Sequence, residues 1–160
     1  MKIALAQLNY TVGDLTNNKV KIINAIREAV GEGADMVVFS EYAISGCPCY
    51  DLLSKSPFID ACEEALHEIA THCVGISALV GLPIQDTNSI MSAAAFIQNG
   101  RVVRYIGKQN VHSRSENSFL SSSKGCEFVE VEGHKVAVVV GEDILTEREF
   151  GNYADTVAVL

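Results

Sequence analysis

The chain has 160 residues, of which 48% are hydrophobic, so it is long enough for one domain with a packed core and too apolar to be disordered. Its 12 Lys and Arg against 20 Asp and Glu give a net charge of -8, which argues against nucleic acid or an anionic membrane surface as the partner. No apolar run approaches the ~20 residues that span a bilayer, and the N-terminal segment is too short and too soon interrupted for a signal peptide. We expect a single cytoplasmic domain over residues 1–160.

Cysteine usage gives no sign of a disulfide framework or a metal site. The five cysteines are an odd count and are scattered along the chain, so reduced thiols are expected. Cys47-Pro48-Cys49 has one residue between its thiols rather than two, and no histidine lies near it at zinc-ligand spacing. No ATP-binding sequence is present, and we expect neither a metal nor another cofactor.

Short apolar runs, most of them bounded by turn residues, indicate the strands. They predict strands at residues 2–8, 36–39, 77–83, 90–98, 101–106, 128–131, 135–140 and 156–160. Asn99-Gly100 is a strong signal for a two-residue hairpin, and Glu132-Gly133 is the turn of a second hairpin. Residues 109–125 are polar and rich in serine, which is typical of a long surface loop.

Two amphipathic segments predict helices. Asp14 is placed to cap the first, which ends at residues 31–33. Ser56 as cap and Pro57 at the first helical position mark the start of the second, and Gly75 stops it. The order is therefore β-α-β-α-β, then two hairpins and one more strand, which indicates a layered α/β domain with a mixed sheet or sheets.

Three strand ends carry candidate chemistry. Residues 36–39 have no polar side chain on either face, as in a strand covered on both sides, and Glu41 follows directly. Ligands in open α/β folds bind at the carboxyl ends of strands, so Glu41 is a candidate base; the alternative is a carboxylate that caps the next loop or pairs with a lysine. Lys108 and Gly141 follow two further strands. We expect all three to follow strands of one layer and to meet at one edge of it, which we call the rim. Glu41 should then lie within salt-bridge reach of Lys108.

Several motifs, in order, resemble the nitrilase (carbon–nitrogen hydrolase) superfamily. They include Phe39-Ser40-Glu41, Leu79-Val80-Gly81-Leu82-Pro83, the strand-end Lys108 and Val140-Gly141-Glu142-Asp143. Within the superfamily, the loop at residues 46–53 is most similar to the glutaminase domain of bacterial glutamine-dependent NAD⁺ synthetases. The resemblance implies an αββα sandwich, of which this chain holds about half to two-thirds.

The resemblance also implies a Glu–Lys–Cys triad in which a thiolate attacks an amide carbon, Glu is the base and Lys supports the oxyanion. Glu41 falls on the triad Glu and Lys108 on the triad Lys, but Gly141 occupies the nucleophile position. The loop after Lys108 is shorter than in the family, and Glu116 is placed loosely at its second Glu. The expected function is therefore that of a glutaminase-like domain without catalytic activity, with a small amide such as glutamine as its ligand.

Two alternatives remain open at this point. One is an active amidase that uses an external nucleophile or another thiol, for which Cys47 and Cys126 are the candidates. The other is a non-catalytic module that assembles with itself or with a partner. We expect self-association into a symmetric homodimer or a higher homo-oligomer, because the final apolar strand lacks the neighbours that the family fold would supply.

Overall fold

The computed structural model describes residues 1–86, 89–109, 127–145 and 155–160. Its strands are β1 (Ile3–Ala6), β2 (Met36–Phe39), β3 (Ser77–Asp86), β4 (Ser89–Gln98), β5 (Arg101–Gly107), β6 (Glu127–Val131), β7 (His134–Val139) and β8 (Thr156–Val159). Its helices are α1 (Leu15–Gly31) and α2 (Ser56–Ala70), with short 3-10 turns η1 (Tyr50–Ser54) and η3 (Gly141–Leu145). Within these ranges, no helix is long and apolar enough to cross a membrane.

The strands form two sheets. The first has five strands in the order β1-β2-β3-β4-β5, and the second has three in the order β6-β7-β8. β1, β2 and β3 are parallel, whereas β4 is antiparallel to both β3 and β5. The carboxyl ends of β2, β3 and β5 therefore lie at the same edge of the five-stranded sheet, where loops and ligand groups converge.

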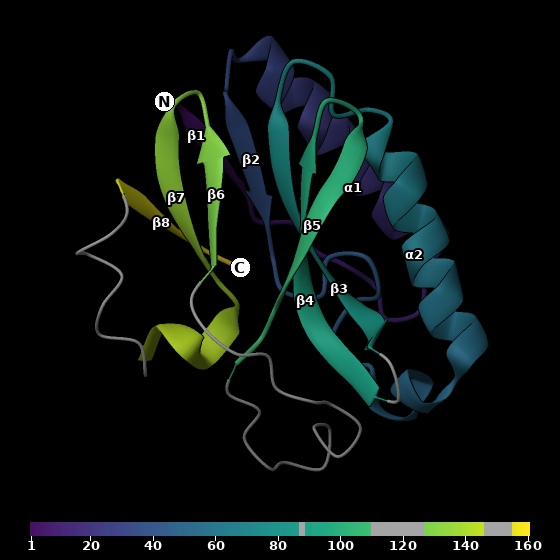
Figure 1. Cartoon of the computed structure of the whole chain (residues 1–160). Coiled ribbons are helices and arrows are strands. Elements are labelled where there is room, and N and C mark those ends of the chain that lie inside the picture. The colour runs from purple at the N-terminus through teal and green to yellow at the C-terminus, as the bar shows by residue number, and fades with distance from the viewer. Residues whose placement is uncertain (87–88, 110–126, 146–154) are drawn as a thin grey trace.

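The two sheets pack face to face, and α1 and α2 cover the other face of the five-stranded sheet (Figure 1). β2 is the second strand of the five-stranded sheet and packs on both faces. Val37 and Phe39 pack in the core under the helices, while Met36 and Val38 pack in the core between the sheets. This alternation confirms that the apolar run at 36–39 is covered on both faces. The described residues thus build three layers of an αββα sandwich.

The hairpin turns follow the sequence prediction. Asn99 and Gly100 have φ of 53° and 75°, and Glu132 and Gly133 have φ of 48° and 74°. Positive φ at both central residues is the signature of a type I′ turn, whose twist matches that of the flanking strands. Asp14 caps α1 as expected, because its carboxylate accepts a hydrogen bond from the Asn17 backbone N–H at 3.2 Å.

Several local predictions were wrong. The second helix ends at Ala70 rather than near Gly75, and β3 runs on to Asp86. The first strand is shorter than residues 2–8, because only Ile3–Ala6 pair with β2. Ser56 is not the cap of α2: it is already helical, and Lys55 takes the cap position without a side-chain hydrogen bond. Pro57 nevertheless lies in the first turn, where its missing N–H costs nothing.

Candidate functional site

Glu41 is positioned by the end of β2 and by a close approach to β3. Its backbone, with that of Ser40, runs directly against Gly81 of β3, and a β-carbon at Gly81 would overlap the carbonyl oxygens of both residues. The Ile44 N–H donates to the Gly81 carbonyl at 3.3 Å and holds the same turn in place. Position 81 therefore needs a glycine because no β-carbon fits there, and not because of its backbone angles.

The Glu41 carboxylate has two partners in the structure. Lys108 Nζ lies 3.0 Å from Oε1 and 3.3 Å from Oε2. The Ser92 hydroxyl donates to Oε1 at 2.8 Å. The side chains of Lys108 and Glu41 are only 13% and 20% exposed, so their attraction is less screened than that of a surface pair.

Ser92 connects the two charged groups and was not predicted from the sequence. It is fully buried on β4, and its carbonyl accepts a hydrogen bond from the Lys108 backbone N–H at 2.8 Å. Its side chain thus orients Glu41 while its main chain positions Lys108. A serine within a run of small strand residues carries no sequence signal of this role.

Gly141 lies directly against this pair. A β-carbon at Gly141 would be 2.5 Å from Glu41 Oε2 and 3.0 Å from Lys108 Nζ. Its φ of +57° is a conformation that residues with a side chain rarely adopt. The three residues therefore meet at one rim, and Glu41 and Lys108 form a salt bridge, as expected from the sequence.

The reason given for this convergence was wrong in one respect. Glu41 and Lys108 follow β2 and β5 of the five-stranded sheet, but Gly141 follows β7, which belongs to the three-stranded sheet. The site is therefore assembled between the two sheets. Asp143, only 2% exposed, joins the two sides, because its carboxylate accepts a hydrogen bond from the backbone N–H of Gln109 at 2.7 Å.

A cavity of about 270 Å³ opens beside Glu41. Its described lining is Tyr10, Ser40, Glu41, Tyr42 and Cys47. Burial raises the pKa of Tyr10 to about 12 and also raises the pKa of Tyr42, to which the Glu41 charge contributes, so both phenols stay protonated at neutral pH. Cys47 is exposed, so its thiol is accessible from solvent. The arrangement offers an ammonium and two phenols as donors and a carboxylate as an acceptor.

Two sequence candidates, Glu116 and Cys126, lie outside the described residues. Of the other thiols, Cys49 is buried, and its Sγ lies 2.8 Å from the Gly46 carbonyl oxygen. Cys62 on α2 and Cys73 just after it are fully buried and serve as small apolar residues of the core.

Comparisons with known proteins identify the family to which this architecture corresponds. The family model for carbon-nitrogen hydrolase matches residues 2–157. The glutamine-dependent NAD(+) synthetase of Aquifex aeolicus is 34% identical over 149 residues, which are 90% of this chain and 26% of that protein. The chain thus spans about a quarter of the length of this curated relative.

Solved structures agree with the sequence matches. The glutamine-dependent NAD⁺ synthetase of Acinetobacter baumannii, solved with ADP, superposes with a TM-score of 0.90 at 25% identity, over 99% of this chain and 31% of that one. A nitrilase-superfamily amidase from Nesterenkonia sp. AN1 gives a TM-score of 0.86 at 21% identity, over 99% of this chain and 64% of that one. Another structure of that amidase carries acrylamide added at its active-site cysteine.

Proposed function

Because the chain belongs to the carbon-nitrogen hydrolase family, as a glutaminase-like domain related to NAD⁺ synthetases, we propose that it binds a small amide such as glutamine without hydrolysing it. The observation that carries this proposal is the place of Gly141. A residue without a side chain stands next to a paired carboxylate and ammonium, where nucleophilic catalysis needs a thiol or hydroxyl.

The retained groups support amide binding by their chemistry. The Lys108 ammonium can donate a hydrogen bond to an amide carbonyl oxygen, and the Glu41 carboxylate can accept one from an amide N–H. Both side chains are largely buried, so such charge-assisted hydrogen bonds are stronger than they would be in open solvent. The cavity beside Glu41 provides room for a small ligand.

The missing step is the covalent one. Gly141 has no thiol or hydroxyl proton for Glu41 to remove and no nucleophilic side-chain atom to form an acyl-enzyme. Losing the nucleophile of a covalent hydrolase costs on the order of 10⁶ in turnover, and only the contribution of binding and oxyanion stabilisation remains.

A second candidate function is hydrolysis by another thiol, which the place of Cys47 favours. Cys47 is exposed and lines the same cavity as Glu41, six residues after it in the chain. In this alternative the Glu41 carboxylate takes the proton from the Cys47 thiol, and Lys108 stabilises the oxyanion. A useful nucleophile at this place would need its pKa lowered by a neighbouring cation.

The two functions are separated by measuring ammonia release and binding on the same samples. We expect the wild-type chain to release no ammonia from glutamine or simple amides, yet to bind one of them in calorimetry, with at least tenfold weaker binding by Glu41→Ala. Cys47→Ser should bind like the wild type. Wild-type turnover that is lost in both Glu41→Ala and Cys47→Ser would establish the thiol mechanism instead. Absence of binding by every protein would contradict the proposed function.

A further inference from the structure

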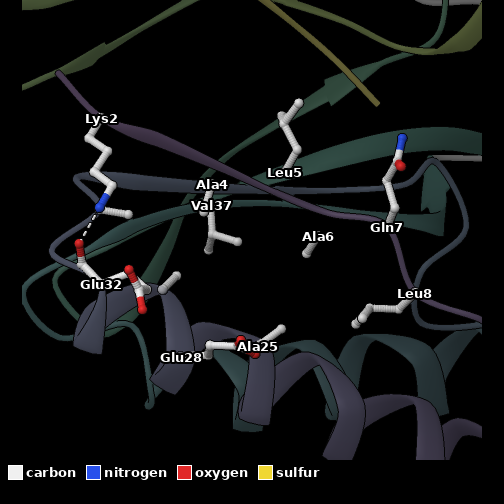
Figure 2. Close-up of a pocket in the computed structure, with 12 residues that line it drawn as sticks. Lys2, Ala4, Leu5, Ala6, Gln7, Leu8, Ala25, Glu28, Glu32 and Val37 are labelled. Carbon is white, nitrogen blue, oxygen red and sulfur yellow. Dashed lines mark hydrogen bonds between the residues drawn. The ribbon is translucent and has the colours of Figure 1, made fainter.

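The cavity beside Glu41 differs from the two hollows that flank β1. The larger hollow, of about 300 Å³, lies between β1 and α1 and is lined by Ala4 and Ala6, among others (Figure 2). The smaller, of about 180 Å³, lies on the opposite side of the strand, toward which Leu5 points. The walls of both hollows are mainly apolar, and such walls do not by themselves indicate what would occupy them.

Tyr10 brings a buried hydroxyl to the wall of the cavity beside Glu41. It lies in the segment between β1 and α1 and lines the cavity together with Ser40, Glu41, Tyr42 and Cys47. Its hydroxyl oxygen is buried and has no hydrogen-bond partner within the described part of the chain. Burial raises the pKa of Tyr10 to about 12, against a smaller lowering by the neighbouring Ser40. The two side chains nevertheless do not meet in hydrogen-bond geometry, so the hydroxyl is a donor that lacks an acceptor.

A buried hydroxyl without a partner is uncommon, because leaving it unpaired costs free energy that a hydrogen bond would recover. The ring of Tyr10 packs against the core under the helices, which restricts how far the hydroxyl can turn toward solvent. Ser40 is exposed, so its side chain is free to turn aside and open the hydroxyl to the cavity. A hydrogen-bond acceptor on a molecule bound in the cavity would then supply the missing partner.

The charges around the cavity restrict what this acceptor can be. Among the described residues that line the cavity, Glu41 is the only charged one, and its partner Lys108 is already engaged at 3.0 Å. The whole chain also carries a net charge of -8, which adds to the repulsion of an anion. A neutral oxygen, such as the carbonyl oxygen of an amide, accepts a hydrogen bond from a phenol without this repulsion.

We propose that Tyr10 determines the ligand specificity of the site by donating a hydrogen bond to a neutral oxygen at the far end of an amide held by Glu41 and Lys108. This inference rests on the proposed function, since it takes an amide as the ligand, and it names the class as neutral amides with a second polar group, such as diamides. A diamide places one amide on the Glu41–Lys108 pair and the carbonyl oxygen of the other on Tyr10. An amide with an apolar far end leaves the hydroxyl unpaired.

Amides of nearly the same size and shape test the proposal by calorimetry. Butanediamide ends in a neutral amide, succinamate in a carboxylate and 4-methylpentanamide in a pair of methyl groups. Each is titrated into the wild-type chain, Tyr10→Phe, Glu41→Ala and Tyr105→Phe. Tyr105→Phe is the matched control, because Tyr105 packs against the same core as Tyr10 but is not among the described residues that line the cavity.

Tyr10→Phe should bind butanediamide about tenfold more weakly than the wild type does, because the far carbonyl oxygen loses its donor. It should bind 4-methylpentanamide as well as the wild type or better. The wild type should prefer butanediamide to succinamate, and Tyr105→Phe should match the wild type with every ligand. In urea without ligand, Tyr10→Phe should unfold at the wild-type midpoint or above it, because the substitution removes a hydroxyl that has no partner in the described residues.

The outcomes separate this inference from the proposed function. If the amides bind and require Glu41, but Tyr10→Phe weakens butanediamide and 4-methylpentanamide equally or not at all, the proposed function stands and the role of Tyr10 is wrong. Tighter binding of succinamate than of butanediamide would overturn the neutral ligand class. A lower midpoint for ligand-free Tyr10→Phe would show that the hydroxyl is already bonded without a ligand and would overturn the inference. Absence of binding by the wild type would contradict both proposals.

Discussion

The rim around Glu41 and the edge at β1 lie in the same sandwich but differ in how their polar groups are satisfied. At the rim, the Glu41 carboxylate bonds both Lys108 and Ser92, and the Lys108 backbone bonds Ser92 in turn. At β1, the outer backbone edge has no partner strand in the described residues, and Leu5 is exposed. The charged groups of the first region are thus paired although Gly141 offers no side chain there, whereas the second region exposes an apolar side chain at a strand edge.

The largest effect on the rim is expected at Gly81. Gly81→Ala should lower the free energy of unfolding by about 3 kcal/mol or more, because the new β-carbon meets backbone carbonyls that cannot rotate away. Gly31→Ala is the control, since a β-carbon at Gly31 has no atom within 4 Å. That change, at the end of α1, should be neutral or stabilise by up to about 1 kcal/mol. Urea denaturation measures both, and equal values would contradict the close packing of Glu41 against β3.

The next effect concerns Gly141. Gly141→Ala should destabilise the chain by about 1 kcal/mol more than Gly133→Ala, because both positions have positive φ but only the new methyl group at 141 meets the Glu41–Lys108 pair. The excess should disappear when both substitutions are compared in a Glu41→Ala background. An excess that persists there would show that the strain does not come from the carboxylate. Gly141→Cys should restore little hydrolysis, because its β-carbon would meet the same Glu41–Lys108 pair.

A smaller effect distinguishes the rim pair from a surface pair. A double-mutant cycle on Glu41 and Lys108 should give a coupling energy of about 1–2 kcal/mol, since both side chains are largely buried. The pair Lys19–Glu68 is shorter, at 2.5 Å, but Glu68 is 55% exposed, so its coupling should stay under about 0.5 kcal/mol and fall in high salt. Equal coupling energies would mean that the rim is as solvated as the surface.

The rate at which cysteines are alkylated also distinguishes the exposed rim from the buried interior. Burial raises the pKa of Cys62 and of Cys73 to about 12, so both thiols stay protonated and enclosed at pH 8. Cys47, which is exposed beside Glu41, should be alkylated by iodoacetamide at least tenfold faster than these two. Peptide mapping identifies the modified residue, and Cys47→Ser should remove the fast phase. Rapid loss of Cys62 or Cys73 would indicate local opening of the core near α2.

The sequence predicted the rim better than its surroundings. The apolar run at 36–39 identified a strand covered on both faces, and Glu41 and Lys108 were placed by their position after strands. The assignment of Gly141 to the same layer was wrong, because alternation along a strand does not tell which sheet it joins. Ser92 was missed because nothing in its local pattern indicates which way its hydroxyl points. The hollows beside β1 depend on three-dimensional packing and left no trace in the sequence beyond an uncharged strand.

The central claim is that Gly141 leaves this rim able to hold an amide but not to form a covalent intermediate. The most direct test is the intact mass of the wild-type chain after it is mixed with excess glutamine and quenched in acid, with Cys47→Ser as the matched sample. We predict only the unmodified mass in both, at every time point. An acyl adduct on the wild-type chain that is absent from Cys47→Ser would contradict the claim and identify Cys47 as the nucleophile.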